Sequence, residues 1–209
     1  MSHALTLMQW LSPAFPVGAF AYSHGLEQVI ADGNVHDAKN LQDWLVDVLV
    51  HGSGHADAVL LAAAYKADNA ADVDAVARAF AAGAERLKET DLQGAAFCDT
   101  ARAVWGVDLH GLTYPVAVGA AARAMDIPLS DTVPLYLHAF ASNLVSVAQR
   151  ALPLGQTDGQ TVLAALSPHI SDAARVAETT PLDALTAASF AANIAAMRHE
   201  TLQPRIFRT

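Results

Sequence analysis

Three side chains near the start of the chain are of types that do acid–base chemistry: Tyr22, His24 and Glu27. His24 and Glu27 lie three residues apart, the spacing that brings two side chains together on a helix. A histidine beside a carboxylate is a common general acid–base pair. No nucleophile with an obvious base accompanies them. Because buried polar groups usually find hydrogen-bond partners, we interpret the trio first as a hydrogen-bonded corner of the core.

A second group of potentially reactive side chains lies between residues 51 and 57. His51, His55 and Asp57 are all of metal-ligating types, and two histidines four apart share a helix face. Two glycines separate the histidines, however, and glycine disfavours a helix. The sequence also contains no Glu-x-x-His pair of the kind that completes a di-iron site in a helical bundle. We therefore expect a solvated loop here and no metal site.

A third candidate is a polar stripe on the helix expected over residues 130–149, which we predict to be the longest. That helix is apolar over most of its circumference, as in a central buried helix. The polar residues share one narrow face: His138, Ser142, Ser146, Gln149 and Arg150. This face either lines an internal polar channel or, as we favour, meets a neighbouring helix through hydrogen bonds. With His24 and Glu27, His138 defines an alternative function, an enzyme with a pocket in the bundle core.

Composition and missing motifs exclude several classes of protein. The net charge is −9 and no run of Lys or Arg occurs, which argues against nucleic-acid binding. There is no Gly-x-x-x-x-Gly-Lys-Ser/Thr loop, so the chain is not itself a P-loop GTPase. The only cysteine, Cys98, has no basic neighbour and is expected to be an inert thiol. We expect no catalytic residue, no cofactor and no metal bound by this chain.

The start of the chain lacks the pattern of a signal peptide, and no stretch approaches about 20 charge-free apolar residues. One cysteine excludes an internal disulfide and suits a reducing compartment. These features predict a cytoplasmic protein outside the membrane. The low charged fraction, 16%, indicates that some apolar surface meets a partner.

The elements that must position these residues are expected to be helices. The chain has 209 residues, is rich in alanine and shows no convincing strand alternation. Helices are expected over the ranges 5–11, 22–31, 38–51, 55–67, 73–80, 85–104, 115–125 and 130–149. Asp37, Asp72 and Ser130 are the expected N-caps, and Ser167-Pro168 and Thr180-Pro181 should each start a further helix. The prediction is a single-domain, all-α bundle of roughly ten helices over residues 1–209.

The C-terminus is cationic in an otherwise acidic chain. Arg198, Arg205 and Arg208 surround the apolar pair Ile206-Phe207, a composition typical of an interface anchor. We expect a partner-binding tail at about residues 198–209 that is mobile in the free protein and becomes ordered on a partner.

Three segments resemble a known family. The first is SPAFPVGAFAYSHGLE at residues 12–27. The second is YLHAFASNLVS at 136–146, followed by PLGQTDGQ at 153–160. The third is MRHET at 197–201 with RIFRT at 205–209. In content, order and spacing they are similar to the UreF family of urease accessory proteins, and the resemblance extends over nearly the whole chain.

The resemblance implies a function that periodicity and composition do not. Members of the family are all-helical, tend to form homodimers and have no catalysis of their own. They bind an accessory protein called UreD or UreH and the nickel-carrying GTPase UreG. The complex activates urease apoprotein in a GTP-dependent nickel-insertion step. On this basis the chain is an adaptor, and nickel is handled by the complex. A third possibility is a purely structural dimerisation domain.

The same resemblance assigns partner-binding positions. They are Pro16, Gly18, Tyr22, Gly25 and Glu27 in the first motif, and Arg198, His199, Glu200, Arg205 and Phe207 in the tail. We expect Tyr22 and the Arg205/Phe207 pair to matter most, with Tyr22 packed where the first motif and the tail converge.

Overall fold

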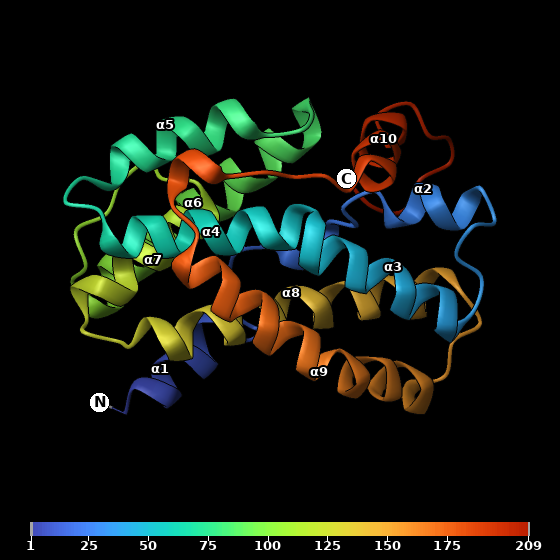
Figure 1. Cartoon of the computed structure of the whole chain (residues 1–209), viewed down its shortest axis with the longest axis horizontal. Coiled ribbons are helices and arrows are strands. Elements are labelled where there is room, and N and C mark those ends of the chain that lie inside the picture. Colours follow the sequence, from blue (N-terminus) through green and yellow to red (C-terminus); the bar gives the residue numbers. More distant parts are fainter. Residues whose placement is uncertain (1, 209) are drawn as a thin grey trace.

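The computed structural model describes residues 2–208, and within them every regular element is a helix (Figure 1). The expected all-α class is therefore confirmed. The α-helices are α1 (His3–Trp10), α2 (Leu26–Ala31), α3 (Ala38–His51), α4 (Ser53–Lys66), α5 (Ala70–Phe80), α6 (Ala84–Trp105), α7 (Tyr114–Ala124), α8 (Leu129–Ala151), α9 (Gln156–Thr179) and α10 (Phe190–His199). Two short 3-10 helices are η1 (Ala19–Ala21) and η2 (Leu182–Ala184).

The centre of the molecule is formed by α4 and α8. Helix α4 is buried around most of its circumference and packs most extensively against α7. Gly119 of α7 permits that close approach, because a Cβ there would collide with the backbone of Leu61. Helix α8 packs chiefly on α9, which also crosses α3. One hydrophobic cluster within the described residues joins Leu7 of α1 to Phe207 near the C-terminus.

Several helix boundaries follow the expected signals and others do not. Asp37 caps α3 by accepting a hydrogen bond from the Asn40 N–H at 2.8 Å. The cap of α5 is Asn69 and not Asp72, which lies in the first turn. Helix α8 begins at Leu129, before the expected cap Ser130, and is one residue shorter than α9.

The two proline signals near the end of the chain behave differently from expectation. Pro168 does not start a helix but lies inside α9. It is tolerated because its side chain and Ala164, four residues earlier, are both exposed, so water can reach the carbonyl that loses its donor. Thr180-Pro181 precedes only the short η2, and the last helix, α10, begins at Phe190 and ends at His199.

The segment around His51 and His55 is not the expected solvated loop. Only Gly52 interrupts the helices there, because α3 ends at His51 and α4 begins at Ser53. His55 and Asp57 are buried in the first turns of α4, whereas His51 is exposed. Burial and the nearby His51 lower the pKa of His55. No group of three or more His, Cys, Asp or Glu side chains suited to a metal ion occurs within residues 2–208.

One segment, Ala38–Lys66, is long and apolar enough by composition to resemble a membrane span. It comprises α3 and α4, and 72% of its most apolar window is buried inside the protein. Burial of this kind is the ordinary property of core helices.

Helices α2 and α10 lie together at one end of the molecule, where the chain also ends (Figure 1). The first motif enters α2, and the tail leaves α10. The fold therefore brings the two motif regions from opposite ends of the sequence to one place.

Candidate functional site

The first motif forms a packed loop over residues 12–25, which we call the signature loop. Phe15 and Val17 are buried, while Pro16 and Gly18 are exposed. The ring of Phe15 lies 5.5 Å from that of Phe97 in α6, so aromatic packing anchors the loop to the body.

The signature loop ends in two left-handed residues, His24 (φ 52°) and Gly25 (φ 80°). Because residues in this region do not continue a right-handed helix, α2 begins at Leu26 and not at the expected Tyr22. Gly25 is also a contact point, since a Cβ there would lie 2.7 Å from the backbone nitrogen of Ala196 in α10. A glycine at this position thus sets the distance between α2 and α10.

Glu27, in the first turn of α2, binds the tail directly. Its carboxylate accepts hydrogen bonds from the backbone N–H groups of Ile206, at 2.6 Å, and Phe207, at 2.9 Å. The His199 ring nitrogen Nε2 lies 2.8 Å from the same carboxylate. Burial alone would raise the pKa of Glu27, but these three hydrogen bonds outweigh it and lower the pKa. The ionised carboxylate therefore stabilises the docked tail.

A second carboxylate, Glu85 at the start of α6, completes this arrangement. Its Oε2 atom lies 2.9 Å from Nδ1 of His199, and its Oε1 atom accepts a hydrogen bond from the guanidinium of Arg205. We call Glu27, Glu85, His199 and Arg205, with the N–H groups of Ile206 and Phe207, the clasp. It joins α2, α6, α10 and the tail.

Further contacts fix the tail on both sides of the clasp. Phe207 is 3% exposed, and the guanidinium of Arg150 lies 4.5 Å from its ring centre. Arg198 donates to Asp32 at 2.7 Å, and Glu200 accepts a hydrogen bond from the Ala84 N–H. The described part of the tail is therefore packed on the body of the protein, whereas we expected a tail that becomes ordered only on a partner. Thr209 lies outside the described residues.

Tyr22 lies where the signature loop and the tail converge, as predicted. Tyr22 is buried. In the tail, the backbone N–H of Arg208 donates to the carbonyl of Ala21, the residue before Tyr22, at 2.7 Å. Burial and the Glu89 carboxylate raise the pKa of Tyr22, while a hydrogen bond with Arg208 opposes them. Tyr22 therefore forms part of the surface on which the tail packs.

A separate group of buried charges lies behind the signature loop. We call His24, Asp57, Arg86, Glu89 and Tyr136 the core network. Arg86 donates to both Asp57 oxygens at 2.6 and 2.7 Å and lies 3.4 Å from Glu89. His24 is paired with Glu89 at 2.9 Å, and the Tyr136 hydroxyl donates to Asp57 at 2.9 Å. Burial would lower the pKa of Arg86, but the two carboxylates raise it. Burial raises the pKa of Tyr136.

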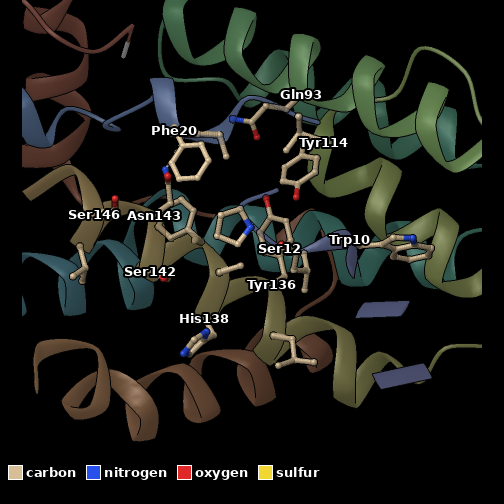
Figure 2. Close-up of a pocket in the computed structure, with 18 of the residues that line it drawn as sticks. Trp10, Ser12, Phe20, Gln93, Tyr114, Tyr136, His138, Ser142, Asn143 and Ser146 are labelled. Atoms are coloured by element: carbon tan, nitrogen blue, oxygen red, sulfur yellow. Dashed lines mark hydrogen bonds between the residues drawn. The ribbon is translucent and has the colours of Figure 1, made fainter. Parts of the chain in front are cut away.

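The core network forms the floor of a cavity of about 760 Å³ between α1, the signature loop, α6 and α8. Figure 2 shows Ser142, Asn143 and Ser146 of α8 on one side of this cavity, with Gln93 and Tyr114 on another. Four residues of the polar stripe thus line a cavity, His138, Ser142, Ser146 and Gln149, whereas Arg150 does not. Our preferred interpretation, hydrogen bonds to a neighbouring helix, holds only for Gln149, which donates to Gln156 of α9 at 3.4 Å. Asn143 also supports the signature loop by donating to the Ala19 carbonyl at 3.0 Å.

The three residues of the enzyme alternative are not brought together. His24 is paired with Glu89, Glu27 belongs to the clasp, and His138 is exposed at the cavity. Glu27 does not line the cavity, and its oxygens are engaged by the tail. The geometry supports structural roles for these residues.

The predicted partner-binding residues fall into two groups in this structure. Five are exposed: Pro16, Gly18, Arg198, Glu200 and Arg205. Five are buried: Tyr22, Gly25, Glu27, His199 and Phe207. The buried group holds the tail and α10 in place, whereas Arg198, Glu200 and Arg205 of the exposed group lie at the edge of the same region.

Sequence reasoning missed the contribution of α6, which supplies Glu85 to the clasp and Arg86 and Glu89 to the core network. In the sequence these residues look like an ordinary solvated helix face. The only sign of a role in the sequence is that these charged residues are three or four apart at the start of a helix, so that they share one face. Their partners Asp57 and His199 are distant in sequence, so the pairs could not be predicted.

Comparison with known proteins identifies the family. The family model for UreF matches residues 35–167. The chain is 58% identical to the urease accessory protein UreF of Roseobacter denitrificans over 207 residues, covering 98% of this chain and 93% of the relative. It is 56% identical to the UreF of Ruegeria sp. strain TM1040, covering 98% and 97%.

A third relative, the UreF of Cereibacter sphaeroides strain ATCC 17025, is 52% identical over the full length of both chains. These alignments include the signature loop and the tail, which lie outside the region that the family model matches. The chain belongs to the UreF family of urease accessory proteins, a chaperone-type family and not a family of catalytic enzymes.

Proposed function

We propose that this chain is an adaptor in urease maturation. It binds a UreD/UreH-type accessory protein and a UreG-type GTPase, and the complex couples GTP hydrolysis to nickel insertion into urease apoprotein. The proposal rests on membership of the family and on one structural observation, an apolar surface beside the clasp.

That surface is one side of α10. Phe190, Ile194 and Met197 are 73%, 56% and 52% exposed, and their spacing of four and three residues places them on one helix face. We call them the α10 face. In the neighbouring tail, Ile206 is 70% exposed. A short helix with an exposed apolar stripe next to arginine side chains has the composition of a protein-binding surface.

The clasp gives this surface a fixed place. His199 ends α10, and its two ring nitrogens meet carboxylates from α2 and α6. We therefore assign the buried motif residues the task of positioning the α10 face and the tail. Arg198, Glu200 and Arg205 lie at its edge and are the motif residues available to a partner.

Homodimerisation stays a prediction. A second exposed apolar surface is formed by Leu5 and Met8 of α1, each 66% exposed. These residues are distant in sequence from α10 and the tail. A purely structural dimerisation domain would tolerate changes on the α10 face as long as the dimer persists, which separates that alternative from the adaptor.

The proposal is tested by placing a charge on the α10 face. Ile194→Glu should abolish co-elution with the UreD/UreH-type protein on a sizing column, because a carboxylate cannot be buried unpaired at an interface. The matched control is Val176→Glu on α9, an aliphatic residue that is 43% exposed and away from the clasp. It should co-elute normally. Unimpaired binding by Ile194→Glu would refute the assignment of this surface.

A further inference from the structure

The environment of His199 fixes its chemical state. The side chain is fully buried, with an exposed fraction of 0%, and each ring nitrogen faces a carboxylate oxygen. Nε2 lies 2.8 Å from Glu27 and Nδ1 lies 2.9 Å from Glu85. Both distances are those of strong hydrogen bonds.

A neutral imidazole cannot make both contacts. It carries one N–H, and its other nitrogen presents a lone pair, whereas an ionised carboxylate only accepts hydrogen bonds. One nitrogen would therefore place a lone pair against a carboxylate oxygen. The contacts are satisfied when the imidazole carries a second proton, or when one of the two carboxyl groups is protonated instead.

Both carboxyl groups have reasons to stay ionised. Glu27 accepts hydrogen bonds from two backbone N–H groups, which favour its ionised form whatever the state of the histidine. Glu85 accepts a hydrogen bond from the guanidinium of Arg205. The proton that completes the clasp is therefore carried by the histidine.

We propose that the clasp is a proton-dependent latch. It is closed when His199 is an imidazolium cation between Glu27 and Glu85, and loss of that proton opens the tail. With the proton in place, two carboxylates are balanced by His199 and Arg205. Without it, the buried site loses a hydrogen bond and is left with an uncompensated negative charge, which is costly away from water.

Charged groups face His199 from each element that packs against α10 at this site, namely α2, α6 and the tail. They are Glu27 from α2, Glu85 from α6 and Arg205 from the tail. On α10 itself the neighbouring Arg198 is bonded to Asp32, and Glu200 accepts from the Ala84 N–H. Deprotonation of His199 is thus the event that changes the charge balance inside the clasp.

Opening of the latch releases the backbone N–H groups of Ile206 and Phe207 from Glu27. It also frees Phe207 from its buried position beside Arg150. The surface that carries the exposed tail arginines would then lose its fixed position. The proton on His199 therefore acts on the shape of the C-terminal region and requires no partner to do so.

The protonation state can be read by NMR on the full chain with 15N-labelled histidine. The His199→Gln variant identifies the His199 signals by their loss. At about pH 7 both ring nitrogens of His199 should show the chemical shifts of protonated nitrogen. A spectrum in which one ring nitrogen is unprotonated while the tail is docked would overturn the proposal.

The latch itself is tested by amide hydrogen exchange at Ile206 and Phe207, corrected for the intrinsic pH dependence of exchange. Over the pH range in which the open form has lost the His199 proton and the docked form still holds it, the opening constant should rise about tenfold per pH unit, as for any one-proton linkage. His199→Gln should lose both the protection and this slope. His110→Gln, at an exposed histidine outside the clasp, should keep both. A pH-independent opening constant in the unmodified chain would contradict the latch.

Discussion

At the scale of single residues, the docking of the tail depends most on Glu27. One carboxylate receives three donors, from His199, Ile206 and Phe207. Each donor belongs to the last eleven residues of the chain, whereas Glu27 belongs to the first motif. Through Glu27, the first motif near the N-terminus therefore forms a binding site for the C-terminal tail.

Replacing Glu27 tests this role. Glu27→Gln removes the charge and turns an amide N–H₂ group toward the donors, so we expect a loss of about 2 kcal/mol in the free energy of unfolding, measured in urea. Asp43→Asn is the control, because it removes a carboxylate from a fully exposed ion pair with Lys39. That variant should keep the unfolding midpoint of the unmodified chain. Equal effects of the two changes would contradict the structural role of Glu27.

The lowered pKa of Glu27 predicts a pH dependence with a definite sign. A carboxylate whose pKa is lower in the folded state contributes stability above its unfolded pKa, ordinarily 4.5, and loses it as the pH falls through the folded value. The stability difference between the unmodified chain and Glu27→Gln should thus shrink in acid, as the pH falls below the unfolded value and through the folded pKa of Glu27. A difference that grows as the pH falls below 4.5 would show that the carboxylate is not stabilised by folding.

The residue-level prediction from sequence was right about Tyr22 and incomplete about its surroundings. Convergence of the signature loop and the tail was inferred from two strong motifs, and Tyr22 and Arg208 meet there. Glu85 and Arg86 could not be found in this way, because only the tertiary contact between α6 and α10 or α4 gives their charges a buried partner.

At the scale of elements, the contact between α2 and α10 positions the site. It depends on Gly25, which combines a left-handed backbone with a close approach to Ala196. The sequence placed a helix on each side of this contact, and both exist. The expected start of α2 at Tyr22 was four residues too early, because sequence periodicity does not register that His24 and Gly25 are left-handed.

Two alanine substitutions separate the backbone effect from the packing effect. Gly25→Ala and Gly33→Ala both force a Cβ into a left-handed conformation, which costs about 1–2 kcal/mol. Only Gly25→Ala also meets the backbone of α10, since Gly33 has open space around it. The unfolding free energy should therefore fall further for Gly25→Ala, by roughly 1–3 kcal/mol. Equal losses would mean that α10 does not rest on Gly25.

At the scale of the whole molecule, the sequence alone predicted the all-α fold class, and the described residues confirm it. Alanine-rich helices without strand alternation indicated an all-α fold. The cavity could not be predicted, because a polar stripe on α8 is equally compatible with a channel and with a helix contact. Only the placement of α1 and the signature loop beside that stripe leaves the cavity open.

Cys98 reports on the integrity of this core. It is 1% exposed, and burial raises the pKa of its thiol. A thiol reagent should therefore label the native chain only as fast as the chain unfolds, in parallel with the loss of helical circular dichroism in urea. Thr161→Cys, on the exposed side of α9, supplies a thiol that should react at once. Rapid labelling of Cys98 in the folded chain would contradict the described packing around α6.

The most direct test of the adaptor proposal compares the full chain with one ending at Ala196 for co-elution with the UreD/UreH-type protein and the UreG-type GTPase. Circular dichroism must show that the shortened chain is helical. We predict that only the full chain forms the complex, because the shortened chain lacks Met197 of the α10 face and the entire tail. Complex formation by the folded, shortened chain would contradict the claim that the C-terminal region is the partner surface.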